Sequence, residues 1–74
     1  MAFVVCVKRG RLKASLEIGR VYRVVRPEGN DPPTSVRIVD ESGEDYLYPQ
    51  DWFEPVELPA RAARALRRHE RARS

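Results

Sequence analysis

The sequence predicts one small, mainly β domain followed by a C-terminal helix, and three observations support this. The chain has 74 residues, fewer than the about 100–150 of a typical domain, so there is room for one core. Its apolar residues fall in short runs separated by Gly and Pro, as is typical of strands and turns. The end of the chain is instead rich in Ala and Arg, which favour a helix. We therefore expect a β domain over residues 1–58 and a helix or partly disordered tail over residues 59–74.

The first two predicted strands lie in the first third of the chain. Residues 2–8 (AFVVCVK) are apolar at even and odd positions, which predicts a central or covered strand with both faces shielded. Residues 21–26 (VYRVVR) place Tyr22 on one face and Arg23 on the other, as a half-buried strand requires. Gly19 comes just before this strand and suits a tight turn with positive φ.

The next two strands are predicted to form a hairpin. Residues 27–34 contain three prolines and a glycine, so this segment is a loop. Residues 35–40 and 45–48 are rich in β-branched and aromatic residues, and a short connection separates them. Gly43 lies in that connection and suits its left-handed position, which predicts antiparallel pairing.

The β domain is predicted to end in a turn and a last strand. Residues 49–53 (PQDWF) combine a proline with two adjacent aromatic residues, and we interpret them as a compact turn with the length of one 3₁₀ turn. Residues 54–58 (EPVEL) then form a short strand. Pro55 confines this strand to a sheet edge or a strand end, because it has no amide hydrogen to donate.

The tail is predicted to be a helix over residues 60–71. Pro59 fits its first turn, and the residues that follow are good or tolerable helix formers. Its apolar stripe consists of Ala62, Leu66 and His69, with a single large residue. We therefore expect a partly frayed helix laid against the β domain, with the last few residues disordered.

Two segments resemble parts of small SH3-like barrels. Residues 47–56 (LYPQDWFEPV) are similar to the end of SH3 domains, where a strand leads into a proline, a 3₁₀ turn and an aromatic residue that starts the last strand. Residues 16–25 (LEIGRVYRVV) look like the stretch in which a glycine turn delivers the second strand. Residues 40–49, with the second of these segments, also resemble short bacterial proteins to which no activity is attached. The resemblance implies a five-stranded SH3-like barrel, a fold that by itself specifies no function.

Peptide-binding SH3 domains grip polyproline helices in an aromatic groove. On this resemblance Pro49 matches the proline of the groove, and Phe53 matches the aromatic residue that follows it. The rest of the pattern departs from the family. Residues 2–7 lack the tyrosine-bearing motif, no tryptophan begins the third strand, and the loop after the first strand is basic where the family's is acidic. Most of the groove is missing, so polyproline binding is a minor alternative.

The net charge of +3 hides three blocks of alternating sign. Residues 1–26 hold seven Lys and Arg against one Glu, residues 27–58 hold one Arg against nine Asp and Glu, and residues 59–74 hold six Arg against one Glu. The blocks may be described in two ways. They neutralise one another within the domain, which we favour because surface charge is usually only solvated, or the basic ends form a footprint for a polyanion.

Several classes of protein are disfavoured by composition. One cysteine excludes an internal disulfide and a multi-cysteine zinc site. The longest apolar run after Met1, residues 2–7, has six residues and precedes its basic residues. A bilayer span needs about 20 apolar residues, and a secretory signal carries its basic residues first. We therefore expect a cytoplasmic protein with no cofactor, no bound metal and no membrane contact.

No catalytic or metal-binding constellation is predicted either. Cys6 lies in an apolar strand, far in sequence from His69, and we expect it to be a small buried hydrophobe. The acidic residues between 40 and 45 lack the ligand spacing of a calcium loop. We interpret them as a solvated hairpin tip whose charges discourage edge-to-edge association. An enzyme is therefore not expected.

Two function hypotheses remain. The first is a non-enzymatic binding or adaptor module that contacts a protein partner through the surface of Trp52, Tyr48 and Pro49 or through the tail. In this hypothesis Phe53 lies in the core and Trp52 is half exposed. The second is a nucleic-acid-binding barrel, in which the tail folds beside the basic turn to form one positive face. Its candidate contacts are Lys8, Arg9, Arg11, Lys13, Arg61, Arg64, Arg68 and Arg71. Binding of single strands would also use exposed aromatic residues, for which Tyr22 and Trp52 are the candidates.

Overall fold

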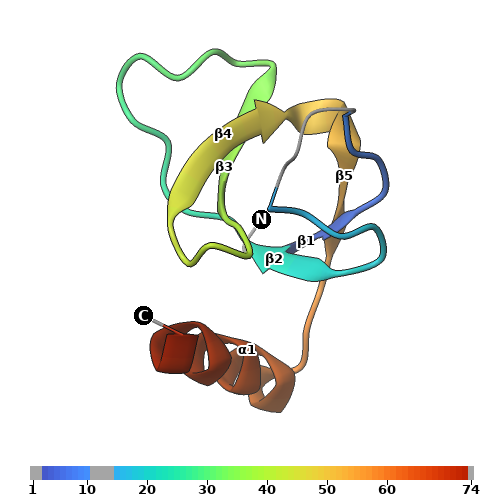
Figure 1. The fold of residues 1–74 in the computed structure, drawn as a ribbon, viewed down its shortest axis with the longest axis vertical. Helices are drawn as coiled ribbons and strands as arrows, with labels where there is room; N and C mark the ends of the chain where they lie inside the picture. Colours follow the sequence, from blue (N-terminus) through green and yellow to red (C-terminus); the bar gives the residue numbers. More distant parts are fainter. Residues whose placement is uncertain (1–2, 11–14, 74) are drawn as a thin grey trace.

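The computed structural model describes residues 3–10 and 15–73, and its five strands form two small sheets with a helix outside them (Figure 1). The elements are β1 (Phe3–Cys6), β2 (Val21–Arg23), β3 (Ser35–Val39), β4 (Asp45–Pro49), η1 (Gln50–Trp52), β5 (Phe53–Val56) and α1 (Ala60–Arg73). One sheet has the order β2-β1-β5 and the other pairs β3 with β4. The predicted mainly β architecture with a C-terminal helix is confirmed at this level.

β1 is the central strand of the three-stranded sheet. It pairs antiparallel with β2 through Val4 and Tyr22, and with β5 through Val4 and Pro55. The two sheets meet where the chain leaves β2. Val24 forms an isolated antiparallel bridge with Ile38, and the amide of Val25 donates to the carbonyl oxygen of Arg37 at 2.9 Å. At this point the two sheets are thus joined by one isolated bridge and one further backbone hydrogen bond.

The core lies between the two sheets. Its buried cluster comprises Val4, Cys6, Leu16, Tyr22, Val36, Ile38 and Phe53. Period-two alternation sends Val4 and Cys6 to this side of β1 and Phe3 to the other. Phe3 is nevertheless buried, and the guanidinium of Arg67 on α1 lies 6.0 Å from the centre of its ring. Both faces of β1 are therefore covered, as its continuous apolar run predicts.

Both glycine turns that the sequence predicts are confirmed. Gly19 has φ +89° and Gly43 has φ +87°, the left-handed region in which an L side chain is strained. Gly19 also donates its amide to the carbonyl oxygen of Cys6 at 2.7 Å, which brings the turn against β1. The hairpin of β3 and β4 is antiparallel, in a register that runs from Ser35 opposite Pro49 to Val39 opposite Asp45.

The C-terminal half departs from prediction in its boundaries. The 3₁₀ turn is confirmed as η1, but β5 begins at Phe53, one residue earlier than expected, and ends at Val56. The helix continues to Arg73, beyond the predicted residue 71. Its half-buried residues are Ala63 and Leu66, whereas Ala62 and His69 are exposed. The half-buried face of the helix is therefore rotated relative to the predicted apolar stripe.

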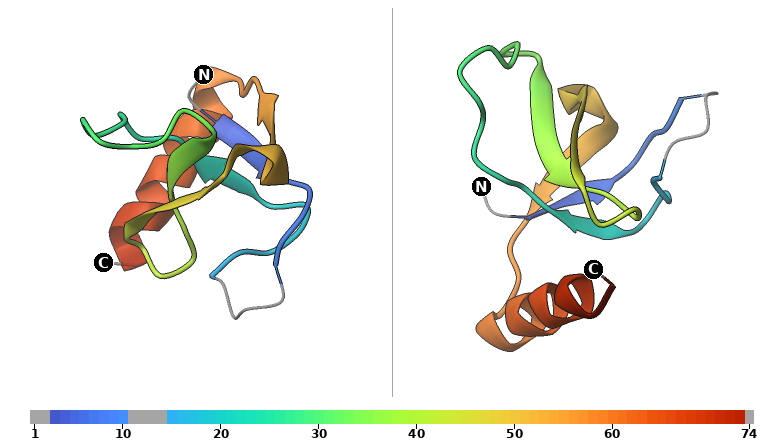
Figure 2. Two further views of the ribbon diagram at one scale, coloured as in Figure 1. Left: turned by 90° about the horizontal axis from the view of Figure 1, so that it is seen from above. Right: turned by 60° about the vertical axis from the view of Figure 1, so that its left-hand side comes forward.

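Arg67 lies over the ring of Phe3 in this rotated orientation of α1. Arg67 is the next residue after Leu66, so the helix turns the face that contains both of them towards the sheet. In Figure 1 α1 lies below β1 and β2, and the right-hand view of Figure 2 also shows it outside the two-sheet body.

Candidate functional site

An open hollow lies beside β4, at the end of the molecule away from α1. Its volume is about 680 Å³. One wall is the end of the loop before β3, and the other is the end of β4 with the start of η1. The residues that line it are Pro33, Thr34, Ser35, Leu47, Tyr48, Pro49, Gln50 and Asp51. The amide of Gln50 donates to the carbonyl oxygen of Thr34 at 2.9 Å, which joins the two walls.

The strand register explains why this hollow presents apolar atoms. Ser35 lies opposite Pro49, and Arg37 lies opposite Leu47. Directly opposed residues share one face of a sheet, so these four occupy the outer face of the β3–β4 pair. Leu47 is 37% exposed there. The exposed leucine and the two prolines of the lining give the hollow apolar surface, while Thr34 and Gln50 add polar groups.

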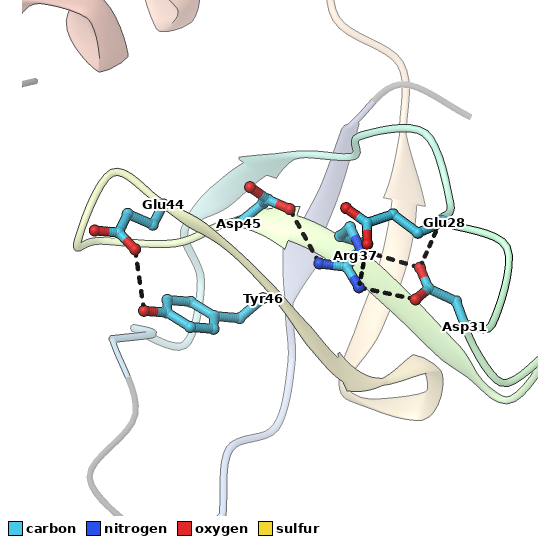
Figure 3. A network of polar contacts seen from close by, with 6 residues as sticks. All are labelled: Glu28, Asp31, Arg37, Glu44, Asp45 and Tyr46. Carbon is cyan, nitrogen blue, oxygen red and sulfur yellow. Dashed lines mark hydrogen bonds and ion pairs between the residues drawn. The ribbon is translucent and has the colours of Figure 1, made fainter.

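A cluster of charged residues surrounds Arg37, which lies opposite Leu47 on the same face of the β3–β4 pair (Figure 3). Arg37 donates from Nε and Nη2 to the two carboxylate oxygens of Asp31, at 3.0 and 2.8 Å, and from Nη1 to Asp45 at 3.1 Å. Glu28 lies 3.7 Å from Nη2. Three carboxylates thus surround one guanidinium, which gives the cluster a net charge of −2 when all are ionised.

The ionisation of this cluster at neutral pH follows from its contacts. The hydrogen bonds from Arg37, and one from the amide of Glu28, lower the pKa of Asp31 to about 2. Hydrogen bonds to Asp31 and Asp45 in turn raise the pKa of Arg37 above its ordinary value. The cluster holds the loop before β3 against the hairpin, and it leaves negative charge at the edge of the hollow.

The three residues proposed for protein contact are only partly brought together. Tyr48 and Pro49 line the hollow, whereas Trp52 is not part of its lining. Trp52 is half-buried and its ring lies 6.0 Å from that of Tyr48. Phe53 is buried in the core, so the expected division between the two adjacent aromatic residues is confirmed.

Trp52 instead holds the segment that follows β1. A Cβ atom added to Gly10 would lie 3.0 Å from Cη2 of the Trp52 ring, which shows how closely this backbone passes the indole. The carbonyl oxygen of Trp52 accepts hydrogen bonds from the amides of Val7 at 2.8 Å and Lys8 at 3.3 Å. One side of the indole is therefore covered by the protein's own chain.

The acidic hairpin is not uniformly a solvated tip, and the expectation is wrong for Asp40. Its side chain is buried, with 6% of the residue exposed. It accepts hydrogen bonds from the hydroxyl of Tyr48 at 2.6 Å and from the amide and hydroxyl of Ser42 at 2.9 and 2.5 Å. A tyrosine packed against the core needs an acceptor for its hydroxyl, and Asp40 provides it.

Glu41 makes the equivalent contact in the other sheet. Its carboxylate accepts from the hydroxyl of Tyr22 at 2.8 Å, and Arg20 lies 3.6 Å away. Burial, reinforced by these hydrogen bonds to carboxylates, raises the pKa of Tyr22 and of Tyr48 above the ordinary value. Glu41 thus ties the hairpin to the three-stranded sheet, whereas Asp40 bonds within the hairpin.

The other two carboxylates, Glu44 and Asp45, are exposed. Glu44 accepts a hydrogen bond from Tyr46 at 3.2 Å (Figure 3).

The predicted basic residues lie in two separate places. Lys8 and Arg9 are in the segment after β1, which runs towards η1 (Figure 1). The ammonium of Lys8 lies 4.0 Å from Asp51, and Arg9 donates to the carbonyl oxygen of Leu16 at 3.0 Å. Arg11 and Lys13 fall outside the described residues. Both views in Figure 2 also separate this segment from α1, so the described residues do not bring the two basic segments onto one face.

On α1 the side chains of Arg61, Arg64 and Arg68 are exposed. The helix includes position 71, but the side chain of Arg71 is outside the described part of the structure.

Cys6 is fully buried, as predicted, and burial raises the pKa of its thiol. Within the described residues, no group of three or more His, Cys, Asp and Glu side chains is placed to hold a metal ion. The helices among these residues include none long and apolar enough to cross a membrane. No family model, curated protein or solved structure matches the chain.

Proposed function

We propose that this chain is a non-enzymatic binding module of SH3-like outline that holds an extended segment of a partner protein in the hollow beside β4. The order of its elements supports the SH3-like outline, since β1 pairs with both β2 and β5 and a 3₁₀ turn separates β4 from β5. The observation that carries the binding proposal is the exposed Leu47, which lies in a hollow bordered by the carboxylates around Arg37.

The chemistry of the hollow defines the partner. Apolar side chains of the partner would cover Leu47 and Pro49, which removes apolar surface from water. Lysine or arginine residues beside them would meet the excess negative charge of the Arg37 cluster. Complementary charge of this kind favours association and sets orientation. The proposed partner is therefore an apolar segment with flanking basic residues.

Two synthetic peptides test this proposal. They share their leucine and proline residues, and one carries arginine where the other carries glutamate. We expect the arginine peptide to shift the amide signals of residues 34–35 and 47–51 in a labelled sample, and the glutamate peptide to shift none of them. Absence of shifts at the hollow with the arginine peptide at about 1 mM, where even weak specific binding is visible, contradicts the proposal.

A matched pair of variants locates the contact. Leu47→Ala removes the exposed side chain in the hollow, and we expect it to weaken binding of the arginine peptide about tenfold, the effect of losing about 1.4 kcal/mol. Ile18→Ala removes an apolar side chain that is 61% exposed in the loop between β1 and β2, and we expect it to leave binding unchanged. Equal effects of the two variants contradict the assignment of the hollow.

A further inference from the structure

The outward face of α1 carries a line of arginine residues. Positions 61, 64, 68 and 71 are separated by three or four residues, so at 3.6 residues per turn they lie on one side of the helix. Ala63 and Leu66, the half-buried residues, are on the opposite side. We call Arg61, Arg64, Arg68 and Arg71 the arginine stripe.

The described side chains of the stripe have no partner within the described part of the molecule. Arg61, Arg64 and Arg68 are exposed, and none of them is within ion-pair distance of a described carboxylate. Arg37 provides the contrast, because its guanidinium is surrounded by three carboxylates. The charges of Arg61, Arg64 and Arg68 therefore face solvent and are not used within the described part of the fold.

We propose that the arginine stripe docks on the phosphate backbone of duplex nucleic acid, independently of sequence. Ten residues separate its ends, which corresponds to about 15 Å along a helix that rises 1.5 Å per residue. One strand of a duplex presents a phosphate about every 3.4 Å along the axis, so about four phosphates lie within that length. Guanidinium groups also form paired hydrogen bonds with phosphate oxygens.

The composition of the same face favours duplex nucleic acid over a single strand and over an anionic membrane. Binding of single strands relies on aromatic side chains that stack on bases, and residues 60–73 contain no Phe, Tyr or Trp. Of the two aromatic residues considered for this role, Tyr22 is 5% exposed, and Trp52 is half-buried with its ring against Gly10 in the segment after β1. An interfacial membrane helix needs a large exposed apolar face, whereas Leu66 of α1 is turned towards the sheet.

This surface is separate from the one in the proposed function. The hollow is lined by the end of β4 and the start of η1, and Figure 1 and the right-hand view of Figure 2 place these elements and α1 at opposite ends of the molecule. The two contacts can therefore be made at once and tested one without the other. A module with both would hold a protein segment against a nucleic acid.

The salt dependence of binding tests the proposal. The full chain is titrated into a fluorescently labelled duplex of mixed sequence, and anisotropy is measured over a series of salt concentrations. Neutralising about four phosphates predicts that log K falls with log salt at a slope of about −3.6, since each phosphate contributes about −0.9. The variant Arg61→Gln, Arg64→Gln, Arg68→Gln should lower affinity at least tenfold at low salt and reduce the slope to about −1.

Two control variants separate the stripe from net charge. The variant Lys8→Gln, Arg20→Gln, Arg26→Gln removes three positive charges from the sheets and loops, and we expect affinity to stay within about threefold because screening weakens distant charges. Replacing the same three helix arginines with lysine keeps the charges, and we expect it to retain the salt slope. Far-ultraviolet circular dichroism verifies that α1 remains helical in every variant.

Each other outcome overturns the proposal. Equal losses in the helix and control glutamine variants assign binding to net charge. Tighter binding to a single strand of the same sequence assigns it to stacking. Binding to vesicles of anionic lipid without binding to the duplex assigns the stripe to membranes, and equally effective competition by a polyglutamate peptide assigns it to acidic proteins. Failure of the peptide titration at the hollow leaves this test unaffected.

Discussion

The acidic hairpin and the arginine helix carry opposite charges and use them in opposite ways. Asp40 and Glu41 of the hairpin accept hydrogen bonds from Tyr48 and Tyr22. Asp31, in the loop before β3, accepts hydrogen bonds from Arg37 of the hairpin. Arg61 and Arg64 are exposed and have no described partner. The comparison shows that two charged segments of one chain can have different roles. Charge held inside a network stabilises the fold, while charge that faces solvent is available to a ligand.

The largest effect on stability is expected where the hairpin meets the core. Asp40→Ala leaves the hydroxyl of Tyr48 without its acceptor and removes both contacts with Ser42. Loss of hydrogen bonds to a buried carboxylate costs about 2–3 kcal/mol, so the urea midpoint should fall with an unchanged m-value. The control is Glu44→Ala at an exposed position of the same hairpin, with an expected change under about 0.5 kcal/mol. Similar losses for both would mean that the hairpin network is not structural.

Trp52→Ala should have the next largest effect. Full burial of a large aromatic residue is worth about 3–5 kcal/mol against alanine, and we expect about 2 kcal/mol here because Trp52 is half-buried. The backbone after β1 should also loosen, since Gly10 packs on the indole ring. Hydrogen exchange of the Val7 and Lys8 amides measures this. Complete unfolding would show that Trp52 is a core residue, and an unchanged exchange rate would show that it does not hold the loop.

The Asp31 cluster should make stability depend on acid. The pKa of Asp31 in the folded chain is about 2, below its ordinary value. A lowered pKa contributes stability that is present above the pKa of the unfolded chain and is lost as pH falls towards the folded value. The melting temperature should therefore fall between about pH 4 and pH 2. In Asp31→Asn part of that fall should disappear. An identical pH profile in the variant would show that Asp31 does not cause the loss of stability in acid.

The smallest effect on stability is expected in α1. Arg64→Gln changes an exposed side chain with no described partner, and glutamine is a comparable helix former. The free energy of unfolding should change by less than about 0.5 kcal/mol. A loss near that of Asp40→Ala, measured by the same urea unfolding, would mean that the arginines of the helix are structural, and the contrast between the two charged regions would be lost.

Local features of the fold were predictable from the sequence, and long-range contacts were not. Gly19 and Gly43 mark their turns because a positive φ is a property of single residues. The continuous apolar run before Lys8 predicted a strand covered on both faces, and β1 is such a strand. The rotation of α1 was missed because one large apolar residue does not determine a face. The face that α1 turns to the sheet contains Ala63 and Leu66, with Arg67 over the ring of Phe3, a contact between residues at opposite ends of the chain.

The candidate site was predictable only in part for the same reason. Tyr48 and Pro49 belong to a recognisable strand end, and both line the hollow. Pro33 lines it too, but its position depends on how the loop before β3 is held by Asp31 and Arg37. No local sequence pattern predicts the pairing of Asp31 with Arg37.

One measurement tests most directly the contrast between two parts of the molecule. In the two-sheet body charged side chains such as Arg37 and Asp31 bond to one another, whereas Arg61, Arg64 and Arg68 of α1 face solvent. Amide chemical shifts of the labelled full chain are recorded during titration with a short duplex at low and at moderate salt. The shifts should be confined to residues 60–73 and should shrink as salt rises, with the signals of β1 to β5 unmoved. Shifts centred on the sheets, or shifts on α1 that do not respond to salt, would contradict this contrast.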